Sequence, residues 1–204
     1  MVDDFARPHP VQLRGKRWAH GLLSLLGWQV RIEGLPALQG VLIAYPHTSN
    51  WDFIYLLLTK WAVGLPVKFW GKESLFALPL MGACMRWLGG VPVRRGAPQG
   101  AVGDMVRTLQ QCRESGRFFW LALSPEGTRK RSGGWRSGFY QVALLSGVPL
   151  GVCSVNYRLK TVDISHFIAL SGDVASDMLR ISDALAGAVG KRAELASPIH
   201  MIHK

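Results

Sequence analysis

The chain has 204 residues, of which 49% are hydrophobic and 18% are charged. This length suits one folded domain, and this composition excludes a disordered chain. The net charge of +11 suits nucleic acid, anionic lipid headgroups or phosphorylated substrates, although it also serves simply to keep an apolar protein soluble. Eight Trp and eight Phe residues beside the cations favour a lipid interface.

The N-terminal region is expected to carry a tail and one short helix. Residues 1–10 are acidic and proline-rich, so we expect them to be frayed and not to act as a signal peptide. Residues 13–27 are basic and then apolar, which predicts a helix that either lies on a membrane or packs on the domain. We expect this region (1–27) to precede one domain over 28–204.

The apolar runs of the chain are shorter than the roughly 20 residues that a transmembrane helix needs. We therefore expect a peripheral protein on the cytoplasmic side of a membrane. Cys84, Cys112 and Cys153 show no CxxC spacing, so we expect buried thiols in a reducing compartment. No HExxH motif or histidine cluster occurs, so we expect neither a metal nor a cofactor.

Short strands alternate with helices through the rest of the chain. This alternation predicts an α/β layered fold with a mostly parallel central sheet flanked by helices. Functional sites in such folds lie at the carboxyl ends of strands. Strands are expected over 28–33, 41–45, 67–70, 91–93, 118–123, 150–157 and 162–170, and helices over 50–63, 74–88 with a break near Pro79, 101–115, 134–146 and 174–195.

The first candidate site is the sequence PHTSNWD, which follows the strand over 41–45. His47 lies on the turn and Asp52 in the first turn of a helix capped by Ser49 or Asn50. The carboxylate can then fold back onto one imidazole nitrogen and leave the other as a general base, with a substrate hydroxyl as the nucleophile. Alternatively, His47 caps the turn and Asp52 only stabilises the helix N-terminus.

Two further turns combine glycine with cations. In SPEGTRKR, Glu126 and Arg129 lie on a turn that follows a buried strand and can bind an anion through backbone N–H groups and Arg. In GGVPVRRG, Arg94 and Arg95 form a candidate phosphate clamp. Both segments also fit solvated surface loops. Lys72, after Phe-Trp-Gly, is a fourth candidate cation that is weak by itself.

These pieces follow one another in a specific order: His-x4-Asp, glycines with paired Arg, Pro-Glu-Gly-Thr-Arg, and Val-Pro-Leu at 148–150. The series resembles the glycerolipid acyltransferase family, whose best-known members are the 1-acylglycerol-3-phosphate acyltransferases. The resemblance covers about 27–157. Two departures leave the acceptor open: Ser124 replaces the family's usual Phe, and Pro92 with Val93 precedes the Arg pair.

The resemblance implies transfer of a fatty acyl chain from acyl-carrier protein or coenzyme A to a hydroxyl of a lysophospholipid-type acceptor, by default lysophosphatidic acid, in phospholipid biosynthesis. His47 would be the general base and Asp52 its orienter. The expected partners are a membrane surface, the lipid acceptor and the thioester donor. The residues implied to shape the acceptor site or to contact its headgroup are Lys72, Arg94, Arg95, Glu126, Gly127, Thr128 and Arg129.

A second class of function is a non-catalytic, basic module that binds membrane surfaces. The presence of both His47 and Asp52 argues against it. Nucleic-acid binding is not expected, since no helix-turn-helix, RNP-type or zinc pattern occurs, and the lack of Gly-x-Ser-x-Gly argues against a serine hydrolase. The sequence indicates no oligomeric state.

Overall fold

The computed structural model describes residues 4–93 and 98–202. The strands are β1 (Gln29–Arg31), β2 (Gln39–Tyr45), β3 (Lys68–Lys72), β4 (Gly90–Val93), β5 (Phe119–Leu123), β6 (Leu150–Asn156) and β7 (Thr161–Ile168). The helices are α1 (Arg17–Leu25), α2 (Asn50–Val63), α3 (Pro79–Trp87), α4 (Pro98–Glu114), α5 (Gly138–Ser146) and α6 (Val174–Ala184), with single 3-10 turns η1 (Glu73–Leu75) and η2 (Ala193–Leu195).

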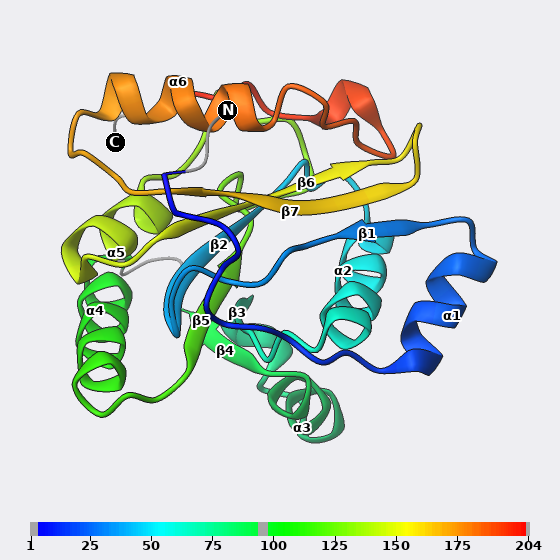
Figure 1. The fold of residues 1–204 in the computed structure, drawn as a ribbon, viewed down its shortest axis with the longest axis horizontal. Coiled ribbons are helices and arrows are strands. Elements are labelled where there is room, and N and C mark those ends of the chain that lie inside the picture. Colours follow the sequence, from blue (N-terminus) through cyan, green and yellow to red (C-terminus); the bar gives the residue numbers. More distant parts are fainter. Residues whose placement is uncertain (1–3, 94–97, 203–204) are drawn as a thin grey trace.

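All seven strands form one sheet in the order β1-β7-β6-β2-β5-β3-β4. Neighbouring strands are parallel except for β6 and β7, which are antiparallel. Figure 1 shows α4 and α5 on one side of this sheet and α1 and α2 on the other, with α6 near β6 and β7. The predicted α/β fold with a mostly parallel sheet is therefore confirmed.

Strand β2 lies at the centre of the sheet and is buried on both faces. Val41 and Ile43 pack into the cluster formed with α4, α5 and α6, whereas Leu42 packs into the cluster formed with α1 and α2. This alternation follows from the two-residue period of a strand. It explains why the sequence QGVLIAY is an almost continuous apolar run, as is usual for a strand covered by helices on both sides.

The chain leaves β2 and enters α2 through a tight, capped turn. Ser49 is the N-cap in extended conformation, and its side chain accepts a hydrogen bond from the backbone N–H of Trp51. Asp52 completes a capping box by accepting from the Ser49 N–H, and Gly64 ends the helix at a φ of 74°. Local capping chemistry thus places the carboxylate directly beside the turn after β2.

The C-terminal region differs from the prediction of a helix over 174–195. Helix α6 ends at Ala184, and residues 186–202 instead run back across the molecule. Val189 lies beside the end of β6, where its carbonyl accepts from the Tyr157 N–H at 2.9 Å. Gly187 and Gly190 interrupt the helical pattern in this stretch, because glycine is a poor helix former.

The C-terminal segment, residues 186–202, also shortens the helix predicted over 134–146. The observed helix α5 begins at Gly138. The Trp135 N–H donates to the carbonyl of His200 at 2.7 Å, and the Ile202 N–H donates to the carbonyl of Trp135 at 3.0 Å. Because these groups bond to the returning C-terminal segment, they are not available to a helix.

Two predictions about the N-terminal half are wrong. The described part of the first ten residues is not frayed. The Asp4 N–H donates to the backbone carbonyl of Phe167 at 3.1 Å, and the Asp4 carboxylate pairs with Arg180. His9 is buried against the ring of Phe167. Cys84 is exposed on α3, because this helix turns only part of its surface toward the core.

Candidate active site

Three neighbouring parallel strands bring distant residues to one edge of the sheet. Strand β2 lies between β6 and β5 and is parallel to both. Chain segments that leave the carboxyl ends of these strands therefore meet, and they carry His47 after β2, Glu126 after β5 and Tyr157 after β6. The site lies where the predicted topology places one, outside the carboxyl ends of the strands.

His47 and Asp52 form a direct pair. Nδ1 of His47 lies 3.2 Å from Oδ2 of Asp52. The His47 side chain is 28% exposed, while that of Asp52 is 1% exposed. The buried carboxylate favours the tautomer with a proton on Nδ1, which leaves Nε2 able to accept a proton. This geometry suits a general base with an orienting carboxylate.

Asp52 is held by the turn that it caps. Oδ2 also accepts from the backbone N–H of Thr48 at 2.7 Å and of Ser49 at 2.8 Å, and Oδ1 accepts from the Tyr157 hydroxyl at 2.6 Å. Burial by itself would raise the pKa of Asp52, but the hydrogen bonds from His47, Tyr157 and the backbone hold the pKa below its ordinary value. The helix-capping role of Asp52 and its contact with His47 therefore coexist.

Glu126 fixes the backbone on which His47 stands. Its side chain is buried, with Oε2 accepting from the His47 N–H at 2.5 Å and Oε1 from the Ser197 N–H at 2.9 Å. Burial raises the pKa of Glu126, and these backbone hydrogen bonds offset part of that effect. Both carboxylate oxygens are thus used to join the His47 turn to the C-terminal segment.

The remaining predicted residues of the Pro-Glu-Gly-Thr-Arg turn lie around this carboxylate. Gly127 has a φ of 64°, and a Cβ atom there would lie 3.0 Å from Nε of Arg136. The Thr128 hydroxyl accepts from the Lys130 N–H at 3.2 Å, which shapes the turn, and the Arg129 side chain is exposed. The turn therefore presents cations outward while Glu126 points inward.

The other predicted cations are less closely tied to His47. Lys72 is the last residue of β3, so it lies at the same edge of the sheet as the histidine, and its side chain is exposed. Arg94 and Arg95 lie outside the described residues.

The C-terminal segment contributes contacts that the sequence did not predict. The Arg192 N–H donates to the Thr48 hydroxyl at 3.3 Å, and the Lys191 ammonium lies 4.8 Å from the centre of the Trp51 ring. A Cβ atom on Gly190 would lie 2.8 Å from the Thr48 hydroxyl oxygen, so glycine is required for this close approach. The sequence signal for this segment was glycine inside a predicted helix, at Gly187 and Gly190.

Tyr157 is another residue of the candidate site that the sequence did not predict. Its position directly after a buried strand could have identified it, because the carboxyl ends of parallel strands carry functional groups in this fold class. Its contact with Asp52 joins residues 105 positions apart in the chain, and no local pattern encodes it.

Comparison with known proteins matches residues 28–156 to the family model described as Acyltransferase. A chloroplastic 1-acyl-sn-glycerol-3-phosphate acyltransferase of Arabidopsis thaliana is 29% identical over 124 residues, which are 59% of this chain and 34% of the relative. The corresponding Brassica napus protein is 28% identical over 126 residues, 60% of this chain and 36% of the relative. The chain thus matches about a third of the length of each curated relative.

Among solved structures, the chain is similar to the crystal structure of the 1-acyl-sn-glycerophosphate acyltransferase PlsC from Thermotoga maritima. The TM-score is 0.52 at 20% sequence identity, and the similarity covers 83% of this chain and 74% of the other. This likeness concerns the fold.

Proposed function

This chain belongs to the acyltransferase family, and on that premise we propose that it moves a fatty acyl chain from a thioester to a hydroxyl of a lysophospholipid-type acceptor. The observation that carries the proposal is the contact between His47 Nδ1 and the buried carboxylate of Asp52, with Nε2 left as the base. Both plant relatives bear the name 1-acyl-sn-glycerol-3-phosphate acyltransferase, which makes lysophosphatidic acid the default acceptor. The reaction would then belong to phospholipid biosynthesis.

The proposed mechanism is one acyl transfer through a tetrahedral intermediate. Nε2 of His47 removes the proton from the acceptor hydroxyl, whose oxygen attacks the thioester carbonyl of acyl-carrier protein or coenzyme A. The C–S bond then breaks, and the imidazolium returns the proton to the departing thiolate. Asp52 stabilises the imidazolium through Nδ1, as carboxylates do in hydrolytic triads. This sequence of steps uses no metal and no cofactor.

We assign the anionic headgroup of the acceptor to the basic rim of the sheet edge. Lys72 ends β3 there, and Arg129 projects from the turn that Gly127 and Thr128 shape. Arg94 and Arg95, which follow β4 in the sequence, complete the proposed set. Phosphate is recognised by Arg through paired N–H donors and by Lys as a point charge, so these residue types fit it.

We further propose that the outer faces of α1, α2 and α3 rest on a membrane surface. The ring centroids of Trp18 and Trp61 lie 5.5 Å apart, and those of Trp61 and Trp87 lie 6.3 Å apart. One row of aromatic rings therefore crosses all three helices. Trp18 is 54% exposed and Trp87 is 77% exposed. Exposed apolar side chains beside cations are typical of interfacial binding. The neighbouring exposed cations and apolar residues are Arg14, Lys16, Arg17, Arg86, Leu78, Leu80 and Met81.

Within residues 4–93 and 98–202, no helix is both long enough and apolar enough to span a bilayer. The proposed attachment therefore uses the surface of α1, α2 and α3. This surface would serve equally a basic, non-catalytic module that binds membranes, which is the second candidate function. Turnover separates the two candidates.

The test is an acyl-transfer assay with purified protein and vesicles of anionic phospholipid. Acyl-carrier-protein and coenzyme A thioesters are each supplied with lysophosphatidic acid, other lysophospholipids or other hydroxylated lipids. We expect acylated product, with lysophosphatidic acid as the best acceptor. Binding to the vesicles without product from any donor and acceptor pair would contradict the enzyme and favour the binding module.

A further inference from the structure

The two oxygens of the Asp52 carboxylate have different tasks. Oδ2 faces the His47 turn and accepts from His47 Nδ1 and from two backbone N–H groups. Oδ1 faces away from that turn and accepts from the Tyr157 hydroxyl at 2.6 Å. Since Asp52 is 1% exposed, water does not replace a partner that is lost at either oxygen.

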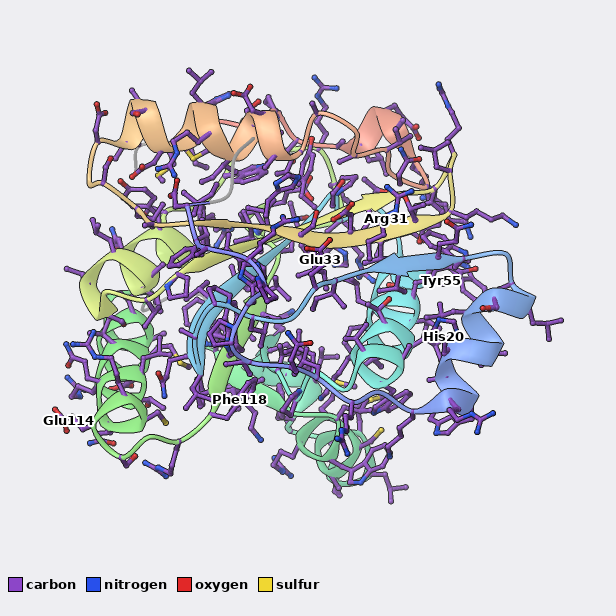
Figure 2. The ribbon with its side chains drawn as sticks, in the orientation of Figure 1. His20, Arg31, Glu33, Tyr55, Glu114 and Phe118 are labelled. Atoms are coloured by element: carbon purple, nitrogen blue, oxygen red, sulfur yellow. The ribbon has the colours of Figure 1, made fainter. Side chains whose placement is uncertain are left out.

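Tyr157 is held by three separate parts of the chain. Its N–H donates to the carbonyl of Val189 in the C-terminal segment at 2.9 Å. Its ring stands edge-on to Trp28, with centroids 4.9 Å apart, and to Tyr55 of α2, with centroids 5.9 Å apart. Tyr55, which is labelled in Figure 2, stacks on Trp28 with ring centroids 4.2 Å apart. Packing therefore fixes the direction of the Tyr157 hydroxyl.

A fixed donor on Oδ1 restrains rotation of the carboxylate about its Cβ–Cγ bond. Without that donor, Oδ2 keeps its two backbone bonds but can tilt away from Nδ1 of His47, whose contact at 3.2 Å is the longest of the four. The donor persists at neutral pH, because burial and the Asp52 carboxylate raise the pKa of Tyr157 well above its ordinary value.

We propose that Tyr157 is a positioning residue for acyl transfer, whose hydroxyl orients Asp52 so that His47 keeps its proton on Nδ1 and directs Nε2 to the acceptor hydroxyl. The inference rests on the proposed function. Tyr157 acts through Asp52 and does not touch the substrate, so its loss affects kcat more than KM.

The chain offers a matched control in a second pair of the same chemistry. Tyr140 donates to the buried carboxylate of Asp177 at 2.7 Å, beside α6 and without a histidine. A second control is Tyr55→Phe, which removes a hydroxyl from the ring cluster that holds Tyr157 and leaves the bond to Asp52 in place.

The experiment compares Tyr157→Phe, Tyr140→Phe and Tyr55→Phe with the wild type in the full chain, by kcat and KM. We expect Tyr157→Phe to lower kcat by about 10- to 100-fold, the loss of one hydrogen bond to a charged group, with KM nearly unchanged. Tyr140→Phe and Tyr55→Phe should keep the wild-type kcat and KM. A Tyr157→Phe variant with wild-type kcat would overturn the inference.

A second measurement is independent of turnover. Nitrogen NMR signals of the His47 imidazole in the folded full chain should show less of the tautomer protonated on Nδ1 in Tyr157→Phe and the wild-type tautomer in Tyr140→Phe. An unchanged His47 tautomer in Tyr157→Phe would overturn the inference even if the variant were less stable. Failure of the proposed function is distinguishable, because it would appear as wild-type protein without transfer or as His47→Ala with full transfer.

Discussion

Helices α2 and α6 begin with nearly the same buried hydrogen bond. Tyr157 donates to Asp52 of α2 at 2.6 Å, and Tyr140 donates to Asp177 of α6 at 2.7 Å. Each carboxylate also accepts two backbone N–H groups from the loop before its helix. Burial by itself would raise the pKa of each aspartate. In both aspartates the hydrogen bonds outweigh burial and hold the pKa below its ordinary value.

The two sites differ in the remaining partner. Asp177 also bonds to the Ser171 hydroxyl and to Arg180, so its donors only close a loop. Asp52 instead contacts Nδ1 of His47, whose side chain is 28% exposed. The same buried arrangement of carboxylate and tyrosine thus closes a loop at Asp177 and forms a candidate catalytic site at Asp52, where a partly exposed histidine is its further partner.

Substitution of the two aspartates should change acyl transfer very unequally. Asp52→Asn should lower acyl transfer by about 10²- to 10⁴-fold, because an amide does not stabilise the imidazolium and can hold the wrong His47 tautomer. Asp177→Asn should leave kcat within a few-fold of the wild type and lower Tm. Steady-state kinetics and thermal unfolding of both variants measure this. Equal losses of activity in the two folded variants would contradict a special role of the Asp52 contact with His47.

Glu126→Gln tests whether the backbone of His47 must be fixed. The amide nitrogen cannot accept a hydrogen bond, so either the His47 N–H or the Ser197 N–H loses its buried partner, at a cost of about 1–3 kcal/mol. We expect kcat to fall by about 10-fold and Tm to fall with it. Glu194→Gln, at an exposed position of the C-terminal segment, is the control and should change neither quantity.

Gly190→Ala tests whether the C-terminal segment supports the site. The added Cβ would lie 2.8 Å from the Thr48 hydroxyl oxygen and 3.1 Å from Pro46, so the segment must shift away from the His47 turn. Overpacking of this kind costs about 1–3 kcal/mol, and we expect a few-fold lower kcat/KM. A Cβ on Gly187 meets no atom within 4 Å, so Gly187→Ala should behave as the wild type in the same assays.

The smallest expected effect is on stability in acid. Folding lowers the pKa of Asp52 and Asp177 below 3.8, so each stabilises the fold above that value and loses this contribution as the pH falls through the folded pKa. Asp177→Asn should therefore flatten the loss of unfolding free energy below about pH 4. Folding raises the pKa of Glu126 above 4.5, so Glu126 makes the fold more stable as the pH falls through its folded pKa toward 4.5, and Glu126→Gln should remove this gain. Denaturant titrations at several pH values measure both slopes.

Local chemistry explains which parts of the site the sequence could predict. The turn after β2 follows from capping by Ser49 and Asp52, so the neighbourhood of His47 and Asp52 was readable from a few adjacent residues. The alternation of strands and helices predicted the sheet edge at which His47 and Glu126 meet, although the Glu126 contacts with backbone N–H groups were not predicted.

Long-range packing explains what was missed. Tyr157 and Ser197 contact the site across 105 and 71 positions of the chain, and no short pattern encodes such contacts. The predicted helix over 174–195 failed for the same reason, because pairing of Val189 with the end of β6 outweighs the apolar periodicity of that stretch.

The most direct test of His47 as the base is acyl transfer by His47→Ala, assayed beside the wild type with the same donor, acceptor and vesicles. The imidazole is partly exposed, so the substitution should leave the fold intact. We expect transfer to fall by about 10²- to 10⁴-fold and to be partly restored by added imidazole, as for a general base whose removal leaves substrate binding intact. Transfer at the wild-type rate by folded His47→Ala would contradict the assignment of the base.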